Sequence, residues 1–190
     1  MSRVRAYLAM SLDGFVAGPG DDLDWLEPRA EGAPAVAAEP WSASDADALH
    51  FGDFLDRVGC ILMGRRTYDI VTRFPDWPYR EIPMHVATHR PLDNPQPTVT
   101  ASRGTIAEMV ERARAVAGRK DVYLDGATVV RDALDARVLD ELVVTVVPTV
   151  LGSGIALFGG LTHPAELTAE HVVRFADGFI QIHLACPTAR

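Results

Sequence analysis

Short apolar runs rich in branched side chains alternate along the chain with segments of helical period. The runs cover residues 4–10, 60–63, 84–88, 122–124 and 142–147. Several of them have no regular polar positions, which is typical of strands buried on both faces of a sheet. This alternation predicts an α/β protein whose central sheet is mostly parallel and is flanked by helices.

Three segments carry apolar side chains at helical spacing, and they cover residues 43–58, 105–116 and 128–136. Ser42 or Ser44 is placed to cap the first of these helices. On the second, Glu108 and Arg112 lie four residues apart on the polar side, so we expect them to pair. The third follows the strand at 122–124 with almost no loop.

The last third of the chain changes character. Two stretches in which apolar and polar residues alternate, 166–175 and 179–186, are separated by Asp177-Gly178. This dipeptide is typical of β-hairpin turns. We therefore expect an antiparallel hairpin that completes one edge of the sheet.

Residues 18–40 form a long segment without a sustained period. The segment is rich in Gly, Pro, Ala, Asp and Glu, with Trp25 near its middle. Loops of this length in compact domains are often active-site lids, and otherwise they are disordered.

The composition limits what the chain can bind. Its 190 residues are 48% hydrophobic and 23% charged, and we expect one domain spanning 1–190, because neither a repeat nor a linker divides them. The net charge of −8 would repel nucleic acid. There is no leader pattern and no run of about 18 apolar residues, so a soluble, cytoplasmic protein without a membrane partner is expected. Cys60 and Cys186 lie among apolar residues and are interpreted as reduced core thiols.

The clearest candidate binding site follows the second apolar run. Gly64-Arg65-Arg66-Thr67-Tyr68 comes directly after that strand and opens a short helix that ends near residue 71. Two guanidinium groups and a hydroxyl then lie at a helix N-terminus, where backbone N–H groups already favour an anion. This pattern predicts a phosphate clamp, although Arg65 and Arg66 could equally pair with surface carboxylates.

A second candidate is Asp125-Gly126-Ala127-Thr128, where the strand at 122–124 turns at once into a helix. Only glycine lets a phosphate or a ring approach the backbone closely at such a turn. On its own, the segment could also be a tight turn without a ligand. Two candidate anion sites after neighbouring strands match a molecule with several separated phosphates, and together they point to a nucleotide cofactor.

Other common nucleotide and metal sites are not supported. The chain lacks the Gly-x-Gly-x-x-Gly and Gly-x4-Gly-Lys-Ser/Thr motifs. His85 and His89 are four residues apart, but on a strand that spacing spans about 13 Å, which is too far for one ion. No metal is therefore expected.

Asp13 is a further candidate, because it ends the first strand. Open α/β sheets bind ligands at the carboxyl ends of their strands. The alternative is an Asp-Gly turn in which the carboxylate caps its own backbone.

Three segments resemble the dihydrofolate reductase superfamily, and within it the branch related to the C-terminal reductase domain of the bacterial riboflavin-biosynthesis enzyme RibD. They are residues 9–14, residues 61–68, and residues 139–142 taken with 148–154. The resemblance covers most of the chain and implies a three-layer, dihydrofolate reductase-like fold with a C-terminal antiparallel hairpin. It also implies an NADPH-dependent oxidoreductase that transfers a hydride to a pyrimidine- or pterin-like heterocycle, similar to 5-amino-6-(5-phosphoribosylamino)uracil reductase.

The resemblance implies a role for each matching residue. For the cofactor, it places Gly64, Arg65, Arg66 and Thr67 at the 2′-phosphate, Thr88 and His89 near the adenine ribose, Asp125, Gly126, Ala127, Thr128 and Val129 at the pyrophosphate, and Ala9 and Val16 beside the nicotinamide. Residues 18–40 would be a mobile loop over it. Asp13 would bind the substrate heterocycle or relay a proton, and Trp25 would stack on it.

Two departures from the family pattern leave other functions open. Asp125-Gly126-Ala127 stands where the family commonly has two or three glycines, so a non-catalytic, nucleotide-binding homodimer is one alternative. A true dihydrofolate reductase is the other. Its pterin-binding carboxylate would fall at Ala48, and the adjacent Asp47 would point about 100° away, which argues against folate reduction. Apolar edge strands are compatible with a homodimer.

Overall fold

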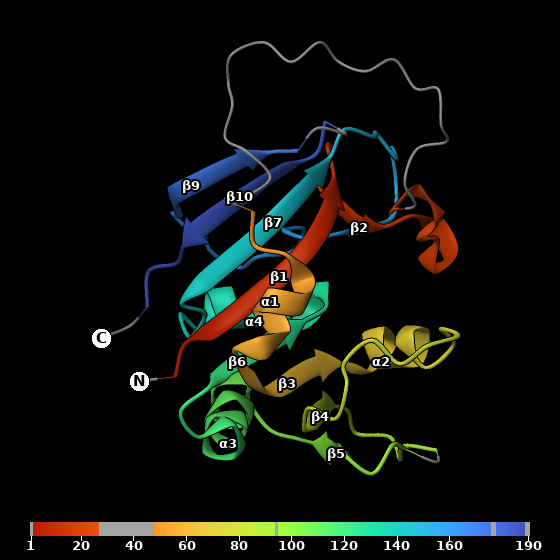
Figure 1. The fold of residues 1–190 in the computed structure, drawn as a ribbon, viewed down its shortest axis with the longest axis vertical. Helices are drawn as coiled ribbons and strands as arrows, with labels where there is room; N and C mark the ends of the chain where they lie inside the picture. The colour runs from red at the N-terminus through yellow and green to blue at the C-terminus, as the bar shows by residue number, and fades with distance from the viewer. Residues whose placement is uncertain (1, 27–47, 94, 176–177, 189–190) are drawn as a thin grey trace.

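An eight-stranded sheet organises the structure, a computed structural model that describes residues 2–26, 48–93, 95–175 and 178–188. The strands are β1 (Val4–Ser11), β3 (Val58–Gly64), β4 (Met84–Ala87), β5 (Val99–Ser102), β6 (Asp121–Asp125), β7 (Glu141–Val147), β9 (Thr168–Arg174) and β10 (Ile180–Ala185). Their order across the sheet is β5-β4-β3-β6-β1-β7-β10-β9 (Figure 1). Neighbours from β5 to β7 are parallel, whereas β10 runs antiparallel to both β7 and β9. The predicted mostly parallel sheet with a C-terminal antiparallel pair is confirmed.

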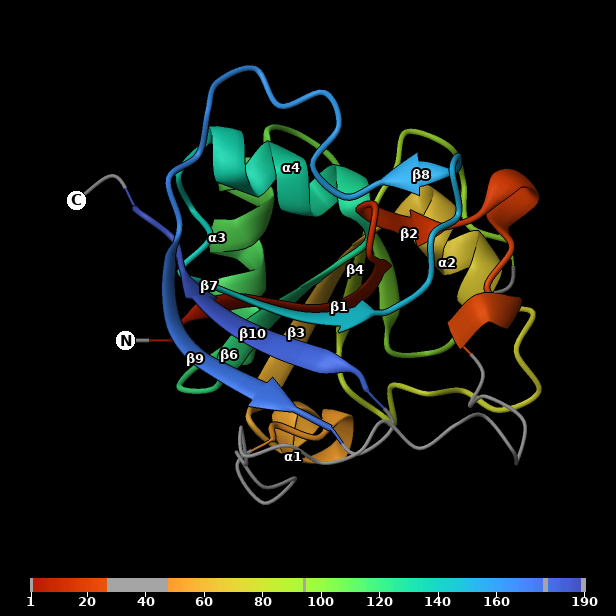
Figure 2. The ribbon, with the colours of Figure 1, turned by 90° about the horizontal axis from the view of Figure 1, so that it is seen from above.

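Helices cover both faces of this sheet. They are α1 (Phe51–Asp56), α2 (Arg65–Val71), α3 (Ile106–Ala117) and α4 (Ala127–Asp135). Figure 2 shows α3 and α4 on one side of the sheet and α1 on the other. A second, two-stranded sheet pairs β2 (Phe15–Ala17) with β8 (Ile155–Ala156). Two short 3-10 helices, η1 (Pro19–Asp21) and η2 (Asp24–Leu26), follow β2.

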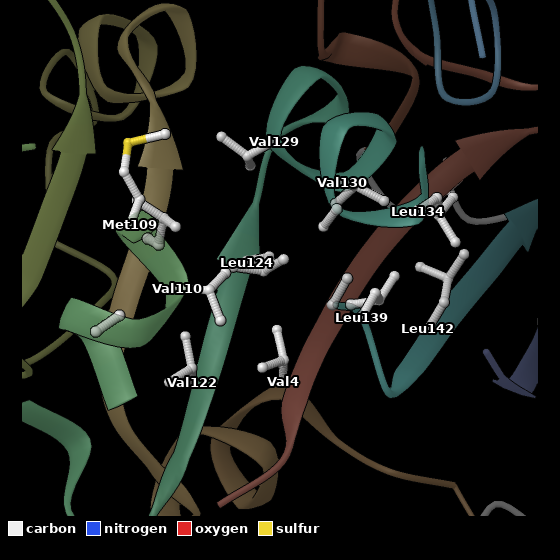
Figure 3. Close-up of a cluster of buried hydrophobic side chains, with 14 of the residues drawn as sticks. Val4, Met109, Val110, Val122, Leu124, Val129, Val130, Leu134, Leu139 and Leu142 are labelled. Carbon is white, nitrogen blue, oxygen red and sulfur yellow. The ribbon is translucent and has the colours of Figure 1, made fainter. Parts of the chain in front are cut away.

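The unbroken apolar runs arise because β6 and its neighbours are packed on both faces. Val122 and Leu124 of β6 point into the cluster formed with α3 and α4 (Figure 3), and both are fully buried. Tyr123 between them points the other way, and its ring centroid lies 4.9 Å from that of Phe54 on α1. Alternate side chains of one strand therefore build two separate apolar layers.

The helix predicted over residues 43–58 is much shorter in the structure. Helix α1 begins only at Phe51, and Val58 already belongs to β3. The backbone of Leu49 is engaged elsewhere: its N–H donates to Gln181 Oε1 at 2.9 Å, and its carbonyl accepts from Gln181 Nε2 at 3.0 Å. The backbone N–H and carbonyl of Leu49 therefore bond to the Gln181 side chain of β10 and not to other residues of a helix. Residues 43–47 and the predicted caps Ser42 and Ser44 lie outside the described residues.

One expectation about the helix after β5 needs correction, and β5 was not predicted. Glu108 does not pair with Arg112, because it completes a capping box with Thr105 at the start of α3. Arg112 instead donates to Ser102 Oγ at 3.2 Å and to the carbonyl of Arg103. Strand β5 itself was missed, because half of its four residues are exposed and only Val99 is large and apolar.

The predicted hairpin is formed by β9 and β10. Gly178 has φ +90°, and its N–H donates to the carbonyl of Phe175 at 3.0 Å, as a tight turn requires. Asp177 lies outside the described residues. Within the described ranges, none of the helices has both the length and the apolar character needed to cross a bilayer.

Both cysteines are free thiols in apolar surroundings. Cys60 is fully buried in β3, and Cys186 follows β10 and is partly buried. Burial raises the pKa of each thiol to about 12. Neither thiol is therefore reactive near neutral pH.

Candidate active site

A pocket of about 570 Å³ opens at the carboxyl ends of β1, β3, β4, β5 and β6. Ligands of parallel α/β sheets bind at this edge. All thirteen residues that the sequence assigned to the cofactor line this one pocket: Ala9, Val16, Gly64, Arg65, Arg66, Thr67, Thr88, His89, Asp125, Gly126, Ala127, Thr128 and Val129. The structure therefore brings together segments that are far apart in the sequence.

Arginine side chains line one end of the pocket. Arg65 is largely buried and donates to Asp69 Oδ1 and to the carbonyl of Pro91, both at 2.7 Å. Arg66 is 64% exposed, and its Nε donates to Asp21 Oδ1 at 2.6 Å. Both arginines thus pair with carboxylates, as the alternative interpretation expected, and both also face the pocket.

A third segment at this end was not predicted from the sequence. Ser102, Arg103 and Gly104 also line the pocket, between β5 and the capped start of α3. Arg103 Nη2 donates to the carbonyl of His89 at 3.2 Å. The signal was present in the sequence, because the segment repeats the strand-to-helix pattern of the other two sites, but it required recognition of β5.

The glycine turn after β6 lies against the start of α2. Gly126 has φ +98°, and a Cβ added to it would overlap Thr67 Oγ1. A side chain here would therefore be strained and would also clash with Thr67, which packs directly against the glycine. The first N–H groups of α4 follow directly, and such groups lack partners within their helix. This turn can accept a phosphate group at close range.

A buried carboxyl group faces the pocket beside three tyrosines. Asp125 is only 7% exposed, and Tyr79 Oη donates to its Oδ2. Tyr123 Oη donates to the carbonyl of Tyr7 at 2.9 Å, and Tyr7, Tyr79 and Tyr123 also line the pocket. Burial raises the pKa of Asp125 to about 6, against the lowering effect of the hydrogen bond from Tyr79. Burial and the adjacent Asp125 charge likewise raise the pKa of Tyr79 far above its ordinary value.

The side chain of Asp125 lies apart from the glycine turn, the place where the pyrophosphate was expected. Asp125 lies two residues beyond Tyr123 on β6, so its side chain shares the sheet face of α1 and Tyr123. Gly126 then turns the chain into α4. The carboxyl group and the glycine turn therefore belong to different parts of the same pocket.

Asp13 is engaged in holding a loop. Its carboxylate accepts the N–H of Leu151 at 3.1 Å and that of Gly152 at 2.7 Å, and Ser11 Oγ donates to it at 2.7 Å. The Ser11 hydrogen bond lowers the pKa of Asp13 below its ordinary value. Asp13 is not among the described residues that line the pocket, so the geometry does not support the expected contact with substrate.

Trp25 also lies off the pocket wall as far as the structure describes it, and its indole Nε1 is buried. Leu23 and Leu26 of the same segment line the pocket instead. The segment therefore covers the pocket with leucine side chains rather than with an indole ring. Residues 27–40 of the expected loop, and Asp47, lie outside the described residues.

A family comparison assigns the chain. The model for the RibD C-terminal domain matches residues 2–181. The chain belongs to the RibD C-terminal domain family. One relative is YwjB of Bacillus subtilis, an uncharacterised protein. The two sequences are 30% identical over 179 residues, which cover 93% of this chain and 94% of YwjB.

Solved structures agree with membership of the RibD C-terminal domain family. A putative riboflavin biosynthesis protein from Shewanella sp. PV-4 is 27% identical, with a TM-score of 0.77, 98% of this chain covered and 99% of that chain. A dihydrofolate reductase from Enterococcus faecalis, solved as a complex with NADP(H), has a TM-score of 0.59 at 16% identity, with 97% and 96% covered. The RibD-type chain thus has a dihydrofolate reductase-like fold, as predicted.

Proposed function

We propose that this RibD C-terminal domain protein is an NADPH-dependent reductase that transfers a hydride to a small, flat heterocycle of the pyrimidine or pterin kind. The observation that carries the proposal is a single pocket with an arginine-lined end, a glycine turn at a helix start, and a buried carboxyl group among tyrosines. These are the groups that a phosphorylated dinucleotide and a polar ring would need. The likeness to a putative riboflavin biosynthesis protein supports a pyrimidine-like substrate.

The residues of the pocket fit this coenzyme. Arg65, Arg66 and Arg103 supply positive charge at one end, and Gly126 lets the Thr67 side chain pack against the start of α4, so that a hydroxyl and free N–H groups lie together on the pocket wall. Ala9 and Val16 offer small apolar surfaces for a ring, and the residues on either side of Val16, Phe15 and Ala17, pair with β8. When bound, NADPH would supply the hydride.

Asp125 is the group best placed to supply the matching proton. With a pKa of about 6, a part of its population is protonated at neutral pH. Because Tyr79 donates to Oδ2, the proton of the neutral acid would be held at Oδ1. A carboxyl group in a site that excludes water can hydrogen-bond a ring nitrogen or carbonyl and transfer its proton there.

Replacement of Arg66 by alanine should weaken NADPH binding by about tenfold and leave NADH binding nearly unchanged, because one charge-assisted hydrogen bond to a phosphate is lost. The measurement is the rise in melting temperature with each coenzyme. Arg80→Ala is the matched control, since Arg80 is 53% exposed, pairs with Asp56 at 2.6 Å and lies off the pocket wall. Equal NADPH affinity in the parent and in Arg66→Ala would contradict the assignment.

The dependence of kcat on pH should report the protonation of Asp125. If Asp125 must be protonated, kcat is highest below a pH of about 6 and falls as the pH rises through that value. Steady NADPH oxidation with a panel of pyrimidines, pterins and small carbonyl compounds, from pH 5 to 9, is the test. A pH-independent rate would remove Asp125 from this role. No turnover with any compound, despite NADPH binding, would favour the non-catalytic nucleotide-binding alternative.

A further inference from the structure

The segment after β2 reaches across to the arginine end of the pocket. Asp21, the last residue of η1, pairs with Arg66 at a distance of 2.6 Å between Oδ1 and Nε. The side chain of Asp21 is 24% exposed and that of Arg66 is 64% exposed. Figure 2 shows this segment beside α2.

The other arginines at this end have partners of a different kind. Arg65 pairs with Asp69, four residues along its own helix, so that ion pair moves with the helix. Arg103 donates to the backbone carbonyl of His89, which carries no net charge. The carboxylate on Arg66, in contrast, comes from a separate segment 45 residues earlier in the chain.

The same segment also forms part of the pocket wall. Leu23 and Leu26, two and five residues after Asp21, both line the pocket. The carboxylate that pairs with Arg66 and two leucines of the pocket wall therefore belong to one short segment of the chain.

We propose that Asp21 is a specificity-determining residue, because its carboxylate competes with the coenzyme's 2′-phosphate for Arg66. This rests on the proposed function. A phosphate dianion and a carboxylate repel each other, so a phosphorylated adenosine binds Arg66 more weakly while the Asp21 carboxylate is paired with the Nε of this side chain. A ribose that carries a free 2′-hydroxyl leaves the ion pair in place and can donate to the carboxylate. Asp21 thus lowers the preference for the phosphorylated coenzyme.

Asp21→Asn removes this charge with little change in shape. Asp21 has φ +67°, a conformation that asparagine tolerates at least as well as aspartate, so the variant should fold. Asp24→Asn is the matched control. Asp24 belongs to the same segment and is exposed, and the substitution removes the same charge without touching the ion pair with Arg66.

Calorimetric titration with adenosine 2′,5′-bisphosphate and with 5′-AMP tests the proposal without any need for turnover. Asp21→Asn should bind the bisphosphate roughly fivefold more tightly than the parent at low salt, and the gain should shrink as salt is added. Binding of 5′-AMP should be unchanged or weaker. Asp24→Asn should resemble the parent with both ligands.

The outcomes separate this inference from the function on which it rests. If the bisphosphate binds the parent but Asp21→Asn improves its affinity no more than Asp24→Asn does, the competition is disproved and the coenzyme site stands. Equal gains for 5′-AMP and the bisphosphate would also overturn it, because the effect would not depend on the 2′-phosphate. If the bisphosphate binds neither the parent nor Asp21→Asn, the proposed function and this inference both fail.

Discussion

Asp125→Asn is expected to reduce turnover by about 10²- to 10⁴-fold, the usual contribution of a positioned general acid. Asparagine keeps the shape of the side chain and can still accept the Tyr79 hydrogen bond through its carbonyl oxygen, but it has no acidic proton. NADPH binding should change little, since the carboxyl group lies on the tyrosine side of the pocket. Stopped-flow or steady-state oxidation of NADPH, with coenzyme affinity measured separately, checks the expectation.

The same substitution should stabilise the fold. The pKa of Asp125 is about 6 in the folded chain against 3.8 as the ordinary value, so the folded state disfavours the charged form. Below pH 3.8 the group is neutral in both states and has no such cost. Between pH 3.8 and about 6 the folded protein loses roughly 3 kcal/mol of stability, and above pH 6 the loss is complete, whereas the asparagine variant has no such loss. Urea unfolding should show a gain at pH 8 that disappears near pH 4.

Asp13→Asn serves as the comparison for both effects. The resemblance implies that Asp13 binds the substrate or relays a proton. In the structure, the Asp13 carboxylate instead accepts hydrogen bonds from the N–H groups of Leu151 and Gly152. This variant should therefore be less stable than the parent and should keep the fall in kcat near pH 6. If Asp13→Asn abolished that pH dependence and Asp125→Asn preserved it, the two assignments would have to be exchanged.

Glu141→Leu is expected to cost about 3–5 kcal/mol of stability, because it leaves a buried guanidinium without its main partner. Arg5 and Glu141 lie opposite each other on β1 and β7, each 4% exposed, with 2.6 Å between Nη2 and Oε1. Asp121 is a weaker partner of Arg5, at 3.5 Å. This ion pair is at the opposite end of β1 from the pocket, so the effect on coenzyme affinity should be small.

A double variant distinguishes loss of the ion pair from loss of packing. Arg5→Leu combined with Glu141→Leu replaces the pair by apolar side chains, and such replacements are often neutral or even stabilising. Urea unfolding of the two single variants and the double variant forms a double-mutant cycle. Additive losses, with the double variant less stable than either single one, would show that the charges contribute independently.

The sequence predicted the features of the fold that depend on local pattern. Branched runs such as Val122 to Leu124 identified the central strands, and Asp125-Gly126 marked the turn between β6 and α4. Helix α1 could not be delimited in this way, because the contact that ends its N-terminal extension joins Leu49 to Gln181, 132 residues later. Local propensity contains no information about such a partner.

In the candidate site too, the features set by local sequence were predictable, and those set by distant contacts were not. The segments proposed to bind phosphate were recognisable because each is a strand followed at once by a helix. The candidate acid, Asp125, was not recognisable, because its raised pKa depends on burial, and its partner Tyr79 is 46 residues earlier in the chain. The ion pair between Asp21 and Arg66 is likewise set by the tertiary fold, since neither residue's neighbours in the sequence predict it.

The inert state of Cys60 and Cys186 makes the native chain suitable for site-specific labelling. With a pKa of about 12, neither thiol forms much thiolate at neutral pH, and maleimide and similar reagents attack the thiolate. A single exposed cysteine, introduced as Asp24→Cys, would therefore carry a spin label or a fluorophore selectively while both natural thiols are kept. Distances from that label to a second probe would then follow the segment over the pocket as nucleotides are added.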